Sequence, residues 1–378
     1  KAMARVEVVP WSMARISRSM NSLRGGSASH LTQRRRLGLS GRMRIASHAG
    51  VQDAARQIAG VAVYTPLIES PALNARLGGR VLIKAETLQH TGAFKFRGAW
   101  NRISRLTPEQ KSRGVVAYSS GNHAQAVAAA ARMVGTHAII VMPADSPAVK
   151  MAGVIAHGGE VRTYDRYTES REAIGAAIAA EHGSVLVPPF DDPLIIEGQG
   201  TVALEVLDQA RAMGADPLDQ LLCGLSGGGM LAGINLALAE VAPHIQVFGV
   251  EPEAYDDTRL SLAAGERRGY APVTRPSICD SLMSPQPGVL TFPINRRMTD
   301  VLTVSDAEVA AAVAYAFRVL KLVVEPGGAV SLAAVLAGKL PTKDRTTALI
   351  LSGGNVDPAL FTAIIEDRYS PETWGTKP

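Results

Sequence analysis

Short apolar runs rich in β-branched residues alternate with alanine-rich stretches of helical length from Ile45 onward. Strands that are apolar throughout and joined by helix-length connections are typical of parallel sheets with helices on both faces. The sequence therefore predicts an α/β fold with doubly wound parallel sheets. The predicted strands are Val81 to Ala85, Val115 to Ser119, Ala138 to Met142, Val161 to Tyr164, Leu221 to Gly224, Val247 to Val250 and Ala348 to Ser352. The predicted helices cover residues 124–134, 171–182, 201–213, 231–241 and 306–321.

The chain has 378 residues, which suits two domains. Two segments are dense in proline and glycine. We interpret residues 187–193 as the crossing between the two domains and residues 275–293 as a long loop folded over a surface.

The positive charge of the chain is concentrated at its N-terminus. Residues 1–44 hold ten lysines and arginines against one glutamate, a net charge of +9, whereas the whole chain carries +5, so the remainder carries −4. This arginine- and serine-rich tail lacks a clear period and is predicted to be disordered. Three interpretations stay open: sequence upstream of a natural start at Met43, which we favour, a mitochondrial transit peptide, and a nucleic-acid-binding arm. Because the basic residues belong to the tail, the folded part is not expected to bind nucleic acid.

Composition excludes other classes of protein. No apolar run reaches the roughly 18 residues that a membrane span needs, so no membrane association is expected. Two cysteines, Cys223 and Cys279, cannot build a disulfide framework, and neither belongs to a zinc motif. We therefore expect a reducing compartment: the cytoplasm, or the mitochondrion if the tail is a transit peptide.

Lys95 lies in the run Gly92-Ala93-Phe94-Lys95-Phe96-Arg97-Gly98-Ala99. Partial burial beside a second cation lowers the pKa of a lysine, which suits a lysine that forms a Schiff base. The flat ring of Phe94 suits packing against an aromatic cofactor. The alternative, from this window alone, is a surface patch of lysine, phenylalanine and arginine.

Two turns from strand to helix offer backbone N–H groups to an anion. The first runs from Ser119 to Gln125 and includes Ser120, Gly121, Asn122 and His123; the alternative is an ordinary helix cap. The second is Ser226-Gly227-Gly228-Gly229-Met230, whose consecutive glycines form a cradle that suits a phosphate.

The second turn also fits the dinucleotide fingerprint. Gly227, Gly229 and Ala232 have its spacing, and Glu251 follows about 20 residues later. An NAD-dependent oxidoreductase is therefore a rival hypothesis, although it explains neither the lysine run nor the first turn.

Two further segments end strands with polar residues. Ser352 opens a Ser-Gly-Gly turn, where a hydroxyl can meet a cofactor nitrogen; the alternative is a plain turn. Glu251 and Asp257, with a backbone carbonyl such as that of Tyr255, are candidate ligands for Mg²⁺ or Ca²⁺; a solvated acidic loop is the alternative.

Together, the lysine run, the two turns and the segment from Leu351 to Asp357 resemble the pyridoxal-phosphate (PLP) serine/threonine dehydratase family, with the motifs in family order. The resemblance implies two domains of the tryptophan synthase β-like type (fold type II), with PLP in the cleft between them. It implies a large PLP-binding domain from residues 45–90 and 190–370 and a small domain from residues 91–189.

The resemblance also implies the roles of single residues. Lys95 would form the Schiff base, Ser120 would act as a second acid or base, and Glu325 would have a supporting role near the active site. Phe94, Asn122, Ser226, Gly227, Gly228, Gly229, Met230 and Ser352 would contact the cofactor, and Ser119, Gly121 and His123 would contact the substrate carboxylate.

The activity that the resemblance implies is a dehydratase (ammonia-lyase) converting threonine or serine to a 2-oxo acid and ammonia. The segment from Ser277 to Met283 departs from the pattern usual in biosynthetic threonine dehydratases, which puts threonine in doubt. A dehydratase of 3-hydroxyaspartate or of a hydroxyectoine breakdown product, and an amino-acid racemase, are alternatives. A silent amino-acid-binding protein on the same fold is the non-enzyme alternative. Family analogy suggests a homodimer or homotetramer.

Overall fold

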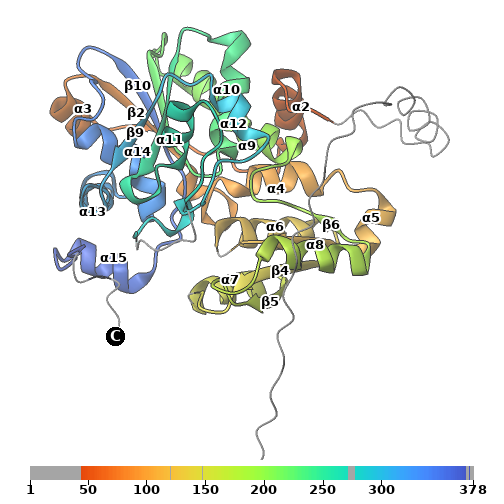
Figure 1. The fold of residues 1–378 in the computed structure, drawn as a ribbon. Coiled ribbons are helices and arrows are strands. Elements are labelled where there is room, and N and C mark those ends of the chain that lie inside the picture. The colour runs from red at the N-terminus through yellow and green to blue at the C-terminus, as the bar shows by residue number, and fades with distance from the viewer. Residues whose placement is uncertain (1–43, 120, 147, 271–276, 372–373, 375–378) are drawn as a thin grey trace, which may run out of the picture. The chain divides into compact units, whose positions relative to one another are not determined.

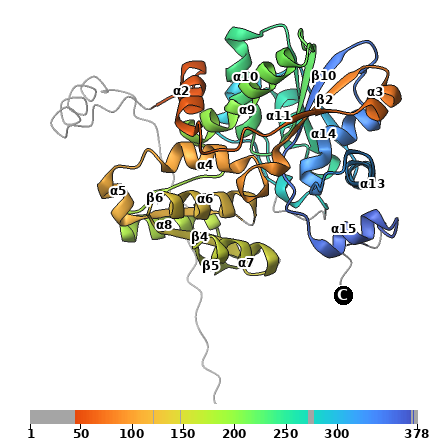
Figure 2. The same ribbon diagram turned by 180° about the vertical axis from the view of Figure 1, so that it is seen from behind.

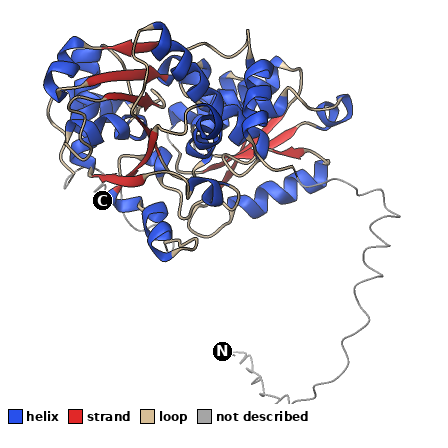
Figure 3. Ribbon diagram, turned by 90° about the horizontal axis from the view of Figure 1, so that it is seen from above, coloured by secondary structure: helices blue, strands red, loops and turns tan. Residues whose placement is uncertain are grey.

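The computed structural model describes residues 44–119, 121–146, 148–270, 277–371 and 374. Residues 45–378 form one compact unit, which contains two separate sheets (Figure 3). The predicted disordered tail lies outside the described residues, except for Arg44.

The larger sheet has six strands within the described residues, in the order β1-β2-β10-β7-β8-β9. β1 pairs with β2 in antiparallel fashion, with Leu67 opposite Lys84, and every other neighbouring pair in this order is parallel. The strands are β1 (Leu67–Glu69), β2 (Arg80–Ala85), β7 (Gln220–Gly224), β8 (Gln246–Pro252), β9 (Asp300–Val304) and β10 (Thr346–Leu351).

Helices cover both faces of the larger sheet (Figures 1 and 2). Side chains of β2 alternate between the two cores: Val81 and Ile83 pack into one, and Leu82 packs into the other. The core around Leu82 is formed with α2 (His48–Ile58), α9 (Pro193–Ala212), α10 (Gly229–Val241) and α12 (Thr291–Asn295). The opposite core is formed with α3 (Pro71–Leu77), α13 (Asp306–Tyr315), α14 (Pro326–Leu336) and α15 (Pro358–Ile365). The short helix α11 (Asp257–Ala264) contacts β9.

The smaller sheet has four parallel strands in the order β5-β4-β3-β6. They are β3 (Val115–Tyr118), β4 (Ala138–Pro143), β5 (Glu160–Tyr164) and β6 (Val185–Leu186). One face packs on α4 (Lys95–Ile103) and α6 (Asn122–Met133), and the other on α8 (Arg171–His182). The helices α5 (Pro108–Arg113) and α7 (Ala148–Ala156) complete this half.

The predicted α/β fold is confirmed, and each of the seven predicted strands corresponds to an observed one. The prediction of parallel sheets is corrected at one edge, because β1 is antiparallel. The helix predicted over residues 201–213 begins earlier, at Pro193, where the carboxylate of Asp192 accepts hydrogen bonds from the N–H groups of Leu194 and Ile195. The helix predicted to run to Lys321 is α-helical only to Tyr315 and then continues as one π-helical turn, η5 (Ala316–Leu320).

All strands of the larger sheet fall within residues 45–90 and 190–370, and all strands of the smaller sheet fall within residues 91–189. The domain boundaries themselves stay a prediction. In the described part of the chain, no helix is long and apolar enough to cross a membrane.

Candidate active site

One cavity is lined by residues from both sheets and their loops. It brings together every described residue that the sequence analysis assigned to contact with the cofactor or the substrate. These residues are Phe94, Lys95, Ser119, Gly121, Asn122, His123, Ser226, Gly227, Gly228, Gly229, Met230 and Ser352. Ser120, predicted as a second acid or base, lies outside the described residues.

The lysine run lies against the segment that follows β10. The N–H of Phe94 donates to the carbonyl of Ser352 over 3.0 Å, and the N–H of Gly354 donates to the carbonyl of Gly92 over 2.8 Å. A β-bridge between Ala93 and Gly353 completes the pairing. Two motifs that are about 260 residues apart in the sequence therefore become neighbours.

The amine of Lys95 is held beside an aromatic ring. Its Nζ donates to the carbonyl of Pro189 over 2.9 Å and lies 5.1 Å from the centre of the Phe94 ring. Burial lowers the pKa of Lys95 to about 8, against the opposing effect of the Glu325 carboxylate. A substantial fraction of this amine is therefore neutral, and so nucleophilic, slightly above neutral pH.

The expected effect of a second cation on Lys95 is not observed. Arg97 points into the protein, where its guanidinium binds both oxygens of Glu86 at 2.8 Å and both oxygens of Glu205 at 2.6 and 2.8 Å. The low pKa of Lys95 follows from its burial instead.

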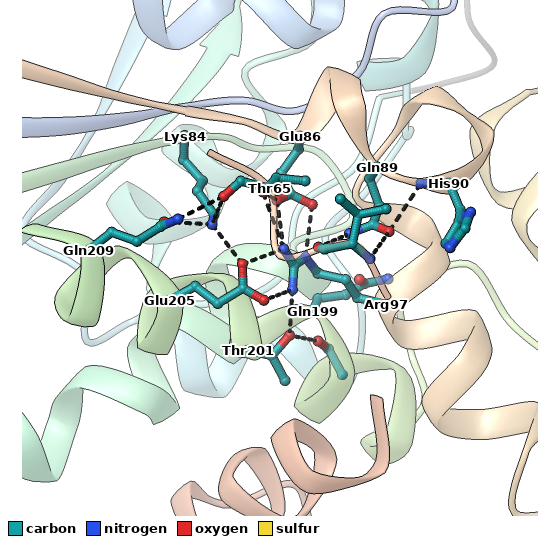
Figure 4. A network of polar contacts seen from close by, with 12 residues as sticks. Thr65, Lys84, Glu86, Gln89, His90, Arg97, Gln199, Thr201, Glu205 and Gln209 are labelled. Carbon is teal, nitrogen blue, oxygen red and sulfur yellow. Dashed lines mark hydrogen bonds and ion pairs between the residues drawn. The ribbon is translucent and has the colours of Figure 1, made fainter. Parts of the chain in front are cut away.

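Arg97 belongs to a buried ionic network that joins α4 to α9 and to the end of β2 (Figure 4). Lys84 Nζ donates to Glu205 over 2.6 Å, to the carbonyl of Thr65 over 2.6 Å and to the side-chain oxygen of Gln209 over 2.8 Å. The side chains of Lys84, Glu86 and Arg97 are fully buried. The positive charges of Lys84 and Arg97 are therefore balanced by the negative charges of Glu86 and Glu205. These ion pairs hold α4, the helix that begins at Lys95, against α9.

The first predicted anion-binding turn opens α6, and its asparagine is fixed by two neighbours. Asn122 donates through Nδ2 to Glu325 Oε1, and its Oδ1 accepts from Asn355 Nδ2 over 2.8 Å. Glu325 is buried, its other carboxylate oxygen has no hydrogen-bond partner among the described residues, and burial raises its pKa to about 7. Glu325 also lines the cavity, in keeping with the supporting role expected for it.

His123 lines the same cavity as a neutral ring. Its Nε2 is 2.9 Å from the carbonyl of Val187, and a carbonyl can only accept, so Nε2 carries the proton. Burial, and then the nearby charge of Lys95, lower the pKa of His123 to about 3. Any contact with a substrate carboxylate is therefore made without a positive charge on this ring.

The glycine loop follows β7 and ends in α10. Gly228 has φ +88°, a conformation that favours glycine. A Cβ atom on Gly227 would lie 2.3 Å from the ring of Phe190, so no larger residue fits there. The small residues leave the free N–H groups at the start of α10 open to an anion. The loop fits the phosphate of PLP, and the lysine, asparagine and serine around the cavity suit its aldehyde and ring.

Several cavity residues were missed by the sequence analysis. Two are cations, Lys150 on α7 and Arg171 at the start of α8. Lys150 forms an ion pair with Asp280, and Arg171 Nε binds Glu172 over 2.8 Å while its guanidinium lies 5.6 Å from the centre of the Tyr118 ring. Nothing in the local sequence marks these side chains, because the fold alone brings them to the cavity.

The predicted metal ligands lie elsewhere, at the end of β8. Glu251 and Asp257 are buried, and both oxygens of Asp257 have no hydrogen-bond partner among the described residues. Burial raises the pKa of both carboxyl groups, and repulsion from Glu251 adds to the effect on Asp257. A cation would relieve this, so the two side chains fit one. Among the described residues, however, no group of three or more His, Cys, Asp or Glu side chains could hold a metal ion, and the metal site stays a prediction.

Comparison with known proteins agrees with this geometry. The sequence model described as "Pyridoxal-phosphate dependent enzyme" matches residues 58–353. The L-threo-3-hydroxyaspartate ammonia-lyase of Pseudomonas sp is 42% identical over 326 residues, which are 86% of this chain and 100% of that protein. The serine racemase of Schizosaccharomyces pombe is 39% identical over 84% of this chain and 97% of its own length.

A solved structure, that of the T.th. threonine deaminase, is 44% identical to this chain. It superposes with a TM-score of 0.76 over 82% of this chain and 99% of its own. The predicted resemblance is thereby confirmed, and the nicotinamide hypothesis is left without support.

Proposed function

This chain belongs to the family of pyridoxal-phosphate-dependent enzymes, and we propose that it is an ammonia-lyase acting on 3-hydroxyaspartate. The net reaction converts the β-hydroxy amino acid to a 2-oxo acid and ammonia: water is lost first and taken up again when ammonia leaves. The observation that carries the proposal is the cavity in which Lys95, the glycine loop and two further cations meet.

We propose that the cofactor is held by residues from both halves of the cavity. The N–H groups of Gly227 to Met230 would bind its phosphate, Asn122 and Ser352 would bind its ring substituents, and Phe94 would pack beside the ring. PLP, when bound, draws electrons from the Cα atom of an attached amino acid and so makes the Cα proton acidic.

The residues of the chain would then orient the substrate and move a proton. The start of α6, with Ser119 and Gly121, would bind the α-carboxylate through N–H groups and the helix dipole. The neutral amine of Lys95, once displaced by the substrate amine, would take the Cα proton as a general base. Asn122 cannot rotate freely, because Glu325 and Asn355 hold both ends of its amide.

The second carboxylate of 3-hydroxyaspartate would bind the cations Lys150 and Arg171, which line the same cavity. Arg171 uses only Nε for Glu172, so its terminal nitrogens can form charge-assisted hydrogen bonds with a ligand. Serine and threonine have no second carboxylate that these cations could bind. This difference, together with the activity of the Pseudomonas relative, favours the dicarboxylic substrate.

The test is to measure ammonia and 2-oxo acid released from serine, threonine and both diastereomers of 3-hydroxyaspartate. The largest kcat/KM is expected for a 3-hydroxyaspartate diastereomer. A preference for threonine or serine would overturn the choice of substrate but not the ammonia-lyase activity. Inversion of the substrate without ammonia release would favour the racemase alternative, in which Ser120 keeps its predicted role.

Replacing Arg171 with glutamine is expected to change substrate selectivity. Loss of a hydrogen bond between charged groups predicts a fall in kcat/KM for 3-hydroxyaspartate of roughly 10- to 100-fold, with the value for serine changed by less than about 3-fold. Arg166→Gln is the matched control, because Arg166 is also partly exposed and paired with an acid, Asp145, but does not line the cavity. Equal losses for both substrates would assign Arg171 a structural role instead.

We further propose that Glu251, Asp257 and the carbonyl of Tyr255 bind Mg²⁺ or Ca²⁺. Adding the cation to chelator-treated protein is expected to raise the melting temperature by about 5 °C at saturating concentration. Asp257→Asn should abolish this rise in melting temperature. Glu253→Gln, which changes a nearby exposed carboxylate, should leave the rise unchanged. A rise that persists in Asp257→Asn would place the cation elsewhere.

A homodimer or homotetramer remains a proposal from family analogy, and a cytoplasmic location remains a proposal from the two free cysteines. Sedimentation of the purified chain tests the first.

A further inference from the structure

Two buried side chains behind the glycine loop hold its carbonyl groups. Thr291 Oγ1 donates to the carbonyl of Gly227 over 2.5 Å, and Asn295 Nδ2 donates to the carbonyl of Gly228 over 3.0 Å. Both belong to α12, a helix of five residues, and they are 0% and 1% exposed. Neither side chain lines the cavity, whereas the glycines that they bind do.

The chemistry of the groups determines which atom of the Asn295 amide faces the loop. The carbonyl of Gly228 can only accept a hydrogen bond, so the atom of Asn295 that faces it must be the amide nitrogen. The other end of the amide, Oδ1, accepts from Asn235 Nδ2 over 3.3 Å, which fixes the orientation of Asn295. The carbonyl of Gly227 also accepts from the N–H of Gly288 over 3.2 Å.

These bonds determine where the loop's N–H groups point. In a trans peptide the carbonyl and the following N–H point in opposite directions. Because Thr291 draws the carbonyl of Gly227 toward α12, the N–H of Gly228 is directed away from α12. In the same way, Asn295 directs the N–H of Gly229 away from α12. Gly228 and Gly229 line the cavity, whereas Thr291 and Asn295 on α12 do not.

The backbone of Gly228 packs closely against the side chains of Thr291 and Asn295. A Cβ atom at Gly228 would lie 2.4 Å from Asn295 Nδ2 and 3.1 Å from Thr291 Oγ1. The backbone of the loop is therefore packed directly on the two polar side chains, without an intervening layer.

We infer that Thr291 and Asn295 are positioning residues for phosphate binding: they orient the N–H groups of Gly228 and Gly229 toward the phosphate of the cofactor. The inference rests on the proposed function, in which the glycine loop binds that phosphate. Neither side chain touches the cofactor, and their effect is transmitted through two peptide planes.

The test compares the binding of PLP and of pyridoxal, which lacks the phosphate, to the cofactor-free full-length protein. Thr291→Val keeps the shape of the side chain and removes its donor, and Asn295→Asp places an acceptor against the carbonyl of Gly228. Each is expected to raise the Kd for PLP roughly 10- to 100-fold, with the Kd for pyridoxal changed by less than about 3-fold. Thr291→Ser retains the hydroxyl and should restore the Kd for PLP to within about 3-fold of the original value.

Thr342→Val is the matched control, because Thr342 Oγ1 also donates to a backbone carbonyl, that of Leu77, over 2.9 Å and is also buried. Thr342 does not line the cavity, so this variant should leave PLP binding unchanged. Inorganic phosphate should compete with PLP less well in Thr291→Val than in the original protein.

The outcomes separate this inference from the proposed function. If the original protein binds pyridoxal as tightly as PLP, the loop is not a phosphate site and the proposed function fails. If the original protein prefers PLP but Thr291→Val and Asn295→Asp keep that preference, the positioning role fails alone. Equal weakening of PLP and pyridoxal, or failure of Thr291→Ser to rescue, would mean that the two side chains only stabilise the fold.

Discussion

Lys95→Ala is expected to lower the release of ammonia from 3-hydroxyaspartate by roughly 10³-fold or more, because the variant loses both the covalent attachment of the cofactor and the general base. The structure holds this amine 5.1 Å from the centre of the Phe94 ring and 2.9 Å from the carbonyl of Pro189. No other lysine except Lys150 lines the cavity in the described part of the chain, and Lys150 is paired with Asp280. Steady-state ammonia release, and mass spectrometry after borohydride reduction of the loaded protein, measure the two losses separately.

Two further variants test whether the loss is specific to the amine of Lys95. Lys95→Arg keeps the positive charge but supplies no neutral amine near pH 8, so it should be as inactive as Lys95→Ala. Lys343→Ala removes an exposed lysine outside the cavity and should change neither activity nor cofactor attachment. Cofactor attached to another lysine after reduction, or ammonia release retained in Lys95→Ala, would contradict the assignment.

The parts of the fold that could be predicted are those whose signal is local. Val115 to Tyr118 and Leu221 to Gly224 are apolar throughout because each lies inside a sheet covered on both faces. β6 has only two residues, so it has no local pattern that marks a strand. In β9 the residues from Val301 to Val304 are strand-favouring, but the run is short and was not predicted. Their pairing with β3 and β8 is determined by tertiary contacts.

The residues of the candidate site also divide into those with a local sequence signal and those without one. Lys95 and the glycine loop could be singled out because each is a compact motif at the end of a strand or the start of a helix. Lys150 and Arg171 lie near the starts of two different helices of the smaller half, and only the tertiary fold brings them to one cavity. The effect assigned to Arg97 was wrong for a related reason: sequence proximity to Lys95 does not show that the guanidinium points away from the cavity into the network of Figure 4.

That network predicts the largest effect on stability. Glu205 binds Arg97 through both oxygens and also binds Lys84, and all three side chains are buried or nearly so. Burial lowers the pKa of Lys84, and the carboxylate of Glu205 opposes this effect because it favours the charged form of the lysine. For Glu86, burial alone would raise the pKa, but Arg97 outweighs that effect and the pKa is lowered. The charges are therefore stable as a balanced set and not individually.

Glu205→Gln is expected to lower the free energy of unfolding by about 3–5 kcal/mol, because it leaves one excess positive charge in the interior. Adding Lys84→Met removes that excess charge, so the double variant should be more stable than Glu205→Gln alone, by about 2 kcal/mol. Glu109→Gln is the control for an exposed ion pair, since Glu109 binds Arg113 with its side chain 77% exposed, and it should cost no more than about 1 kcal/mol. Urea unfolding at a fixed concentration of PLP measures these three variants and Lys84→Met alone. Equal or additive losses in the double variant would show that Lys84 and Glu205 stabilise the protein independently, and that charge balance does not hold α4 and its lysine in place.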